Sequence, residues 1–315
     1  MHCQDVSGRE ETGYPSRSRT AERMRQCGLR LVTRVEGTAV INVDAVVRSP
    51  STALVRQRAR LAKSLRGLST GEWNAPSRCG GWTVQDVVEH LVGVNRFWSL
   101  SIQAGVRGEP TRLLKSFDPV RVPAAMVEAA RGASASATLD GFQATNAELG
   151  TLVGSLTDAD WDKLAEAPPG HLAIRAVALH ALWDSWVHER DILVPLSRQQ
   201  AVEFDEVLLS LAYAAALGPG FRAAAGSTST GSLGVIGHHP EIELTVEAGS
   251  EVTVHLGVPE DADATIEGDA VQLLEALSLR APRLPIAEKH RWLLAGLDEA
   301  FDAGPYLDAV PPAPS

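Results

Sequence analysis

Three polar residues that lie within otherwise apolar segments could bind a metal ion: His90, Asp184 and His188. Residues four positions apart share one face of an α-helix, so Asp184 and His188 are expected to point the same way. Two imidazoles and one carboxylate suit a divalent ion of the zinc type and leave one coordination position open for chemistry. Because burying each polar group without a partner costs free energy, one metal ion would satisfy all three together. The three residues therefore predict a metalloenzyme.

His180 extends this row, since His180, Asp184 and His188 follow one another at intervals of four residues. His180 could replace Asp184 as a ligand, or it could lie one turn, about 6 Å, along the helix axis and support the ligands. The axial offset favours the supporting role. Glu189 and Asp191 are expected to face solvent or to orient neighbouring groups, because a metal-bound histidine needs an acceptor for its second ring N–H.

Other reactive residues give weaker signals. The three cysteines, Cys3, Cys27 and Cys79, are too few for a disulfide framework and fit a reducing cytoplasm. Cys79 could be a nucleophile, but a small buried residue in the turn before a helix is the preferred interpretation. His238 and His239 are expected in a surface turn. No glycine-rich phosphate loop precedes a helix and no serine elbow occurs, so nucleotide binding and serine or cysteine hydrolase chemistry have no support.

The composition is that of an ordinary globular protein. The chain has 315 residues, 44% hydrophobic and 22% charged, which is enough for one large or two modest domains. A formal charge of −10 without a Lys/Arg stripe argues against nucleic acid as a partner. No apolar run approaches the roughly 18 residues of a membrane span, so no membrane segment is expected.

The chain divides into four regions by composition and periodicity. Residues 1–44 are charged and Arg-rich without an apolar signal core, and are expected to be a disordered leader or a mis-annotated start. Residues 45–222 are expected to form a helical bundle, and residues 230–284 a small α+β domain. Residues 285–315 are expected to form a helical tail with a Pro-rich end.

The elements that must position the candidate ligands are helices. Apolar residues at helical spacing predict five of them, over residues 51–68, 84–103, 123–156, 171–193 and 199–217. Thr83 is expected to cap the second helix, with Asp86 in its first turn. Four long helices with polar residues facing inward are typical of a four-helix bundle with a metal site in its core.

The pattern changes to strands after the fifth helix. Residues 226–232 have the composition of a linker. Residues 241–246 and 251–256 alternate between apolar and polar side chains, which predicts a β-hairpin. Helices are expected over residues 270–279 and 287–303. The predicted fold class is therefore α+β, with a helical bundle followed by a small α+β domain.

Two segments resemble the mycothiol-dependent maleylpyruvate isomerase family of actinobacteria. They are Cys79-Gly80-Gly81-Trp82-Thr83-Val84, followed by His90-Leu91, and Asp184-Ser185-Trp186-Val187-His188-Glu189-Arg190-Asp191-Ile192. The resemblance covers about residues 45–220 and implies a DinB-like four-helix bundle. The segment Thr265-Ile266-Glu267-Gly268-Asp269-Ala270 is similar to the small sterol-carrier-like domain that often follows this bundle.

The resemblance also implies roles for individual residues. His90, Asp184 and His188 match the metal-ligand positions of the family, although the middle ligand of the isomerases is typically Glu rather than Asp. The C-terminal helix of the family often ends in a Gly-Arg pair that faces the active site. Here the corresponding residues are Ser278-Leu279-Arg280, so Arg280 is the catalytic candidate, as an anion-binding residue.

The expected function is that of a cytoplasmic enzyme that depends on a divalent metal ion, zinc by preference, and on mycothiol as a thiol cosubstrate. A thiolate could add to an activated double bond, allow rotation and leave again, which gives cis–trans isomerisation. The alternatives are a mycothiol S-transferase, a metal-dependent hydrolase and a non-catalytic metal- or ligand-binding module. The expected partners are a small-molecule substrate and the low-molecular-weight thiol; the physiological substrate and the oligomeric state stay open.

Overall fold

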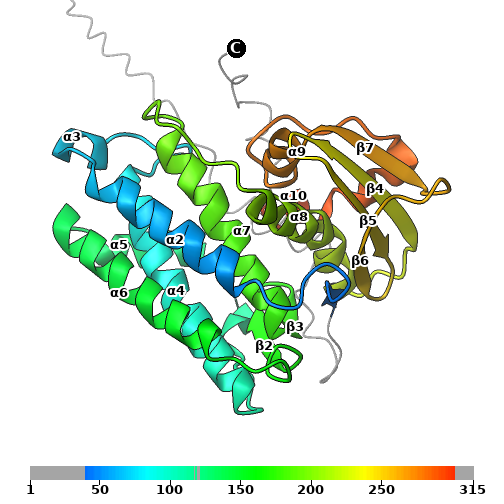
Figure 1. Cartoon of the computed structure of the whole chain (residues 1–315), viewed down its shortest axis with the longest axis horizontal. Helices are drawn as coiled ribbons and strands as arrows, with labels where there is room; N and C mark the ends of the chain where they lie inside the picture. The colour runs from blue at the N-terminus through cyan, green and yellow to red at the C-terminus, as the bar shows by residue number, and fades with distance from the viewer. Residues whose placement is uncertain (1–39, 117, 119–120, 302–315) are drawn as a thin grey trace, which may run out of the picture.

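The computed structural model describes residues 40–116, 118 and 121–301, and shows a helical bundle beside a smaller unit built on a β-sheet (Figure 1). The α+β class predicted from the sequence is confirmed. Residues 1–39 of the expected leader, and residues 302–315 of the expected tail, lie outside the described residues.

Four long helices form the bundle: α2 (Ser51–Arg66), α4 (Val84–Val106), α6 (Ala135–Gly154) and α7 (Ile174–Leu193). Helix α2 contacts α6 and α7, and α4 contacts the same two helices, so the four surround one interior in the order α2, α6, α4, α7. Helices α4 and α7, which carry the expected ligands, are therefore neighbours.

Capping boxes set two helix starts. Thr83 accepts a hydrogen bond from the Asp86 backbone N–H at 3.2 Å, and Asp86 accepts one from the Thr83 N–H at 2.9 Å, as expected from the sequence. Ser69 and Glu72 form a second box that opens the short helix α3 (Thr70–Trp73). Ser69 therefore begins the short helix α3 just after α2 has ended.

The single helix expected over residues 123–156 is wrong. The segment forms two helices, α5 (Arg121–Ala130) and α6, with the 3₁₀ turn η1 (Leu113–Ser116) before them. Gly132 has a φ of +96°, a conformation that glycine adopts without a side-chain penalty and that ends a helix. The Ser134 side chain then caps α6 by accepting from the Ala137 N–H.

The helix expected from residue 171 begins later, at Ile174. The preceding residues form an antiparallel hairpin of β2 (Leu164–Ala167) and β3 (Gly170–Ala173), which the sequence did not predict. The hairpin lies against α4 and α7 at one end of the bundle.

Helix α8 (Phe204–Ala224) joins the bundle to the smaller unit. It runs through Gly218-Pro219-Gly220, so the expected end at Leu217 is wrong. It contacts α7 on one side and α9, β5 and β6 on the other. By length and composition α8 could cross a membrane, but 89% of its most apolar window is buried inside the fold, as in a core helix.

The smaller unit contains a five-stranded sheet in the order β1-β6-β5-β4-β7. Its strands are β1 (Ile41–Asn42), β4 (Gly231–His238), β5 (Ile242–Ala248), β6 (Val252–Leu256) and β7 (Ala264–Asp269). The predicted hairpin is present, with β5 and β6 paired antiparallel. The linker expected over residues 226–232 is shorter than predicted, because β4 begins at Gly231.

Two boundaries of the expected regions need correction. Ile41 and Val43 are fully buried and β1 pairs in parallel with β6, so the chain joins the sheet before residue 44. At the other end, the helix expected over residues 287–303 is divided into a 3₁₀ helix, η2 (Glu288–Leu293), and α10 (Gly296–Phe301). Helix α10 packs on α8.

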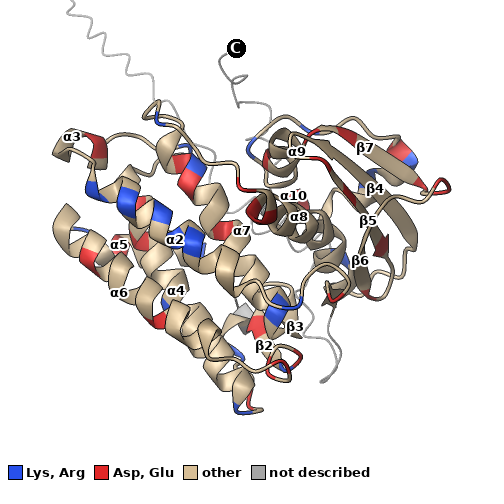
Figure 2. Ribbon diagram, viewed as in Figure 1, with Lys and Arg blue, Asp and Glu red and all other residues tan. Residues whose placement is uncertain are grey.

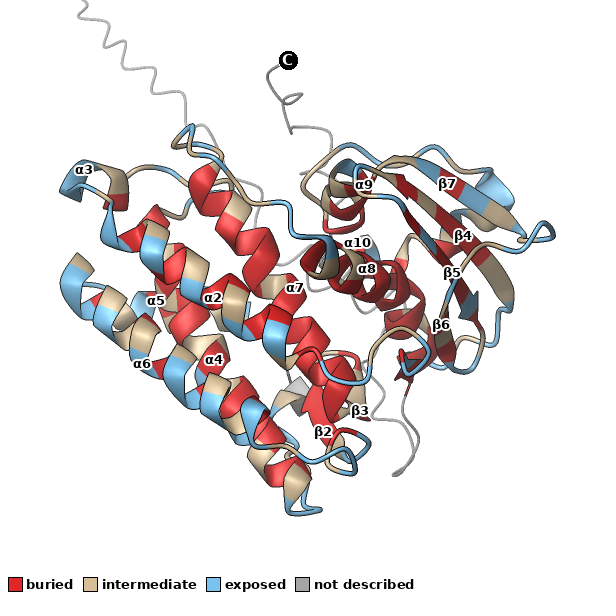
Figure 3. Ribbon diagram, viewed as in Figure 1, coloured by how far each residue is buried: buried red, intermediate tan, exposed pale blue. Residues whose placement is uncertain are grey.

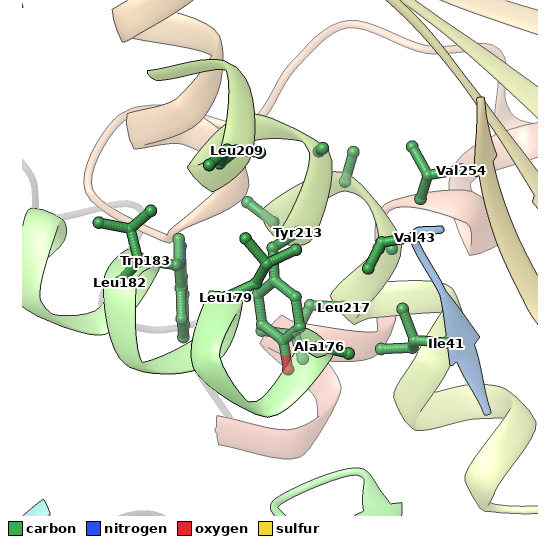
Figure 4. Close-up of a cluster of buried hydrophobic side chains, with 14 of the residues drawn as sticks. Ile41, Val43, Ala176, Leu179, Leu182, Trp183, Leu209, Tyr213, Leu217 and Val254 are labelled. Carbon is green, nitrogen blue, oxygen red and sulfur yellow. The ribbon is translucent and has the colours of Figure 1, made fainter. Parts of the chain in front are cut away.

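One hydrophobic cluster runs through both units. Helices α7 and α8 are buried on nearly all sides (Figure 3). Leu179 of α7 and Tyr213 and Leu217 of α8 lie beside Ile41 and Val254 of the sheet (Figure 4). This shared core fixes the smaller unit against α7. It thereby places the end of α9 (Ala270–Leu277) near the expected ligands.

Ion pairs also connect α2 to α7 and α8. Arg60 donates to Glu189 of α7 at 2.7 Å and to Glu206 of α8 at 2.6 Å, and Arg56 pairs with Asp205 and Glu206. Figure 2 shows the basic residues of α2 beside acidic residues of its neighbours. Glu189 is therefore buried in an ion-pair network, which excludes the solvent-facing position expected as one alternative.

Candidate metal centre

The three predicted ligands converge inside the bundle. Asp184 Oδ1 lies 3.5 Å from His188 Nε2 and 3.8 Å from His90 Nε2, and the three ligand atoms all lie within 4.8 Å of one another. His90 comes from the second turn of α4, and the other two residues come from one face of α7. The helix-face argument from the sequence thus accounts for the α7 pair, and the packing of α4 on α7 brings in His90.

The donor set fits a divalent ion of the zinc type. His90 and His188 are 6% and 8% exposed, and both His90 Nδ1 and Asp184 Oδ2 are buried without a hydrogen-bond partner. A tetrahedral ion with ligand bonds of about 2.0–2.1 Å separates its ligand atoms by about 3.3–3.4 Å, close to the distances found between these residues. Converging ligand atoms in a buried site, on residues that carry a further nitrogen or oxygen without a partner, fit a metal site.

The electrostatic environment favours the forms that bind metal at two of these residues. Burial lowers the pKa of His90, so its imidazole is neutral. Burial by itself raises the pKa of Asp184, but the neighbouring His188 and His90 outweigh it and hold that pKa well below its usual range. A neutral imidazole and an ionised carboxylate are both ready to donate electron pairs.

The other nitrogen of His188 is held by Asp191. His188 Nδ1 lies 3.0 Å from Asp191 Oδ2, and Asp191 is fully buried, so it orients His188 rather than facing solvent. Burial alone would lower the pKa of His188, but Cys79, Asp184 and Asp191 together raise it well above the usual value. The contact of Nδ1 with Asp191 fixes the orientation of the ring, so that Nε2 faces Asp184.

Arg280 binds Asp191 from the smaller unit. It donates from Nε to Asp191 Oδ1 at 2.9 Å and from Nη2 to Oδ2 at 3.0 Å, and its side chain is 26% exposed. The guanidinium thus neutralises a buried carboxylate on the side of His188 opposite to the ligand atoms. Direct contact of Arg280 with a bound anion stays a prediction, whereas its contact with Asp191 is observed.

Cys79 lies in the same cluster, which the sequence did not indicate. Its Sγ is 3.2 Å from Asp191 Oδ2 and 3.7 Å from His188 Nδ1, with Arg280 Nη2 at 3.8 Å. The Arg78 backbone N–H donates to the Asp191 carbonyl at 3.0 Å, so the loop before α4 is attached to the end of α7. Cys79, His188 and Asp191 are close enough to share an ion, but the Arg280 guanidinium disfavours a cation there.

The remaining histidines lie apart from the ligand atoms. His180 Nδ1 is 2.8 Å from the Tyr213 hydroxyl, and its ring packs against Trp98 and Trp183. Burial lowers the pKa of His180 to about 4. His180 contacts Tyr213 rather than a candidate ligand, so its supporting role stays a prediction. His238 is a partly exposed residue that bonds to surface glutamates.

Comparisons with known proteins identify the bundle. Residues 54–193 match the family model of the mycothiol maleylpyruvate isomerase N-terminal domain, and this segment contains all three candidate ligands. The crystal structure of the mycothiol-dependent maleylpyruvate isomerase has a TM-score of 0.54 and 13% identity, covering 80% of this chain and 96% of that one. A histidine-to-alanine variant of that enzyme matches equally well, at 12% identity. No curated protein matches in sequence. At this identity the solved structures show a shared fold.

Proposed function

The chain belongs, through residues 54–193, to the mycothiol maleylpyruvate isomerase family, and we propose that it is a metal- and mycothiol-dependent isomerase. One observation carries this proposal. Within the segment that matches the family, His90, Asp184 and His188 bring one ligand atom each within 4.8 Å of one another in a buried site, and His90 and Asp184 each have a further buried atom without a partner. The two solved isomerase structures support the same assignment through their fold.

Each residue of the site has a task that follows from its contacts. Asp184 and the two histidines would hold the ion, and Asp191 keeps the Nε2 atom of His188 turned toward them. A bound zinc-type ion would lower the pKa of a thiol, so that thiolate is available near neutral pH. Trp82, whose ring centroid is 5.5 Å from that of His90, would form an apolar wall beside the ion.

The proposed reaction is a reversible addition. The mycothiol thiolate adds to one carbon of an activated double bond, and the π electrons move to the conjugated carbonyl oxygen. The former double bond, now single, rotates. The electron pair then returns, the double bond forms again in the trans arrangement, and the thiolate leaves unchanged. The reaction needs no oxidant, reductant or net proton.

The test is an assay of maleylpyruvate turnover by the zinc-loaded protein with and without mycothiol. The proposal expects turnover only when both zinc and the thiol are present. Turnover without thiol would instead indicate hydrolysis by metal-bound water. A protein that binds one equivalent of zinc and turns over nothing would be a binding module. Full activity after removal of zinc by a chelator would refute metal dependence.

A mycothiol S-transferase is the second candidate, because Asp184 stands where the isomerases resembled by this chain typically have Glu. The shorter carboxylate changes the space beside the ion, and with it the electrophile that fits. An alkyl halide offered together with mycothiol distinguishes the two reactions. An S-transferase would release halide and form a stable thioether, whereas an isomerase would return the thiol.

A further inference from the structure

Arg58 of α2 is a cation in the interior of the bundle. It is 2% exposed, and its Nε and Nη2 donate to Asn95 Oδ1 at 3.2 Å, while Nη2 also donates to the Ala181 carbonyl at 2.8 Å. Both acceptors are neutral. Among the described residues no carboxylate lies within ion-pair distance of Arg58, and its Nη1 has no hydrogen-bond partner. A buried charge without an opposite charge beside it is costly. A bound anion at Arg58 would offset this cost.

Further donors without partners lie in the same layer of the bundle. Asn95 Nδ2 donates to Asn146 Oδ1 at 2.8 Å, and Asn146 Nδ2 has no partner. Trp98 Nε1 and Ser99 Oγ are also buried and unpartnered, and they share a face of α4 with Asn95 because they lie three and four residues from it. Helices α2, α4 and α6 therefore each bring an unused donor to this layer.

This layer lies next to the candidate metal centre. Arg58 contacts Ala181, and the ring centroid of Trp98 is 4.8 Å from that of His180, so both side chains reach α7 about one turn before Asp184. Burial lowers the pKa of Arg58 to about 10, and the charge of Asp184 acts in the opposite direction. Arg58 is therefore within electrostatic range of the ligand carboxylate.

The charges of this region leave room for two negative charges on bound molecules. The charges of Arg58 and Asp184 sum to zero although the two side chains form no ion pair, those of Arg280 and Asp191 sum to zero as well, and the histidine ligands are neutral when they bind metal. A divalent ion would then leave a formal charge of +2 in a buried site. The thiolate of the proposed reaction would bring one negative charge to the ion, and a substrate carboxylate would bring the second to Arg58.

We propose that Arg58 binds a carboxylate of the substrate, with the unused N–H groups of Trp98 and Asn146 as additional donors. The ligand class is a small unsaturated carboxylic acid, to which the substrate of the proposed reaction belongs. This inference rests on the proposed function for the metal site, and it assigns specificity to residues outside that site. Arg58 is thus a binding residue for the substrate anion rather than only a connection between helices.

The unpartnered N–H of Trp98 supports the same proposal and leads to a separate test. A buried N–H without an acceptor destabilises the free protein, so removing it should not destabilise the fold. Trp98→Phe deletes the N–H and keeps an aromatic ring. This variant should melt at the same temperature as the wild type or higher, and should bind the substrate anion several-fold more weakly.

The experiment is calorimetric titration of maleate into the zinc-loaded protein, with neutral maleamide as the comparison ligand. Arg58→Met should weaken maleate binding at least tenfold, Arg58→Lys should weaken it less, and neither should change the zinc content. Arg56→Met is the matched control, because it removes the same charge from the same helix at a half-exposed position. Maleate affinity of that control should stay within twofold of the wild type.

The outcomes separate the inference from the proposed function. Maleate affinity that is unchanged in a folded Arg58→Met protein would overturn the inference and make Arg58 a structural residue. If Arg58→Met does not fold, Arg58→Lys and Trp98→Phe decide, and unchanged affinity in both overturns it. Wild-type protein that binds maleate through Arg58 yet never isomerises maleylpyruvate would refute the proposed function while supporting the inference.

Discussion

His188 has a different polar cluster on each of its two ring nitrogens. On the Nε2 side, the ligand cluster of His90 and Asp184 contains buried atoms without partners. On the Nδ1 side, the junction cluster of Cys79, Asp191 and Arg280 has its charges paired and its hydrogen bonds made. The difference indicates that unsatisfied groups mark where a ligand binds, whereas satisfied groups hold those ligands in position.

The two clusters also differ in origin. The ligand cluster comes from α4 and α7 of the bundle alone, whereas the junction cluster combines the bundle with the residues after α9. Arg78 and Arg190 strengthen this junction by donating to Glu275 of α9 at 2.9 and 2.6 Å. The smaller unit therefore contacts the candidate metal site through Asp191 and contributes no residue to the ligand cluster.

The largest effect is expected from removing a member of the ligand cluster. His90→Ala and Asp184→Ala should each reduce bound zinc below about a tenth of an equivalent. They should reduce kcat/KM on the order of 10³-fold, because the several kcal/mol supplied by the ion are lost. Elemental analysis and steady-state kinetics measure the two quantities.

The control for this prediction is His238→Ala, which removes a surface imidazole of the smaller unit. Its zinc content and kinetics should match those of the wild type. A His90→Ala protein that retains both zinc and activity would show that the ligand cluster is not the metal site.

The next largest effect is expected in the junction cluster. Arg280→Met removes the nearer of two arginines beside the fully buried Asp191 and leaves Arg78 at 3.8 Å, which should lower the free energy of unfolding by about 2 kcal/mol. Zinc affinity should fall about 10- to 100-fold, because His188 loses its fixed orientation. Urea unfolding and a competitive zinc titration measure these changes.

A double-mutant cycle makes this prediction specific. Asp191→Asn combined with Arg280→Met removes both charges, so the double variant should be more stable than the sum of the two single effects implies. If Arg280→Met instead lowers kcat with zinc affinity and stability unchanged, Arg280 contacts the substrate, as expected from the family resemblance.

A pH effect is expected next to the ligand cluster, at His180. Its pKa is about 4 in the folded protein and about 6.5 when unfolded, because burial disfavours the charged form. The unfolded state therefore takes up a proton first as the pH falls. The contribution of the neutral His180 to stability is fully present above pH 6.5 and is lost as the pH falls toward 4. At pH 5 the loss in unfolding free energy amounts to about 2 kcal/mol.

The measurement is the difference in unfolding free energy between wild type and His180→Asn across pH 5–7, which removes effects common to both proteins. The wild type should lose more stability on acidification than the variant. Parallel pH profiles would mean that His180 takes up a proton in the folded state, which would contradict its description as a buried, neutral imidazole.

The proximity of Asp184 and His188 could be predicted because its signal is local. Asp184 and His188 are four residues apart in an apolar helix, and polar residues in such a position stand out. Arg58 gave no such signal, because it lies among Arg56 and Arg60 in a helix with a charged face. Only the packing of α2 on α4 and α7 shows that this arginine points inward.

Strand β4 was missed for a related reason. The linker expected over residues 226–232 overlaps the first two residues of β4, and the strand continues through Gly234, where a Cβ would lie 2.7 Å from Val258 Cγ1. The glycine is required by close packing within the sheet rather than by flexibility. Tertiary contacts also explain why helix α8 continues through Pro219. Its contacts with α10 and β1 outweigh the low helix propensity of proline and glycine.

The smallest effect is expected from Cys79→Ala, which tests whether the junction cluster takes part in chemistry. Asp191 already accepts hydrogen bonds from His188 and Arg280, and a thiol is a weak donor, so its loss should cost less than about 1 kcal/mol. Activity should stay within about threefold of the wild type, with zinc retained. A folded, zinc-loaded Cys79→Ala protein without activity would show that the thiol takes part in the reaction. The contrast between the two clusters would then fail. A group of the junction cluster, whose hydrogen bonds are already made, would take part in the reaction as well as orient His188.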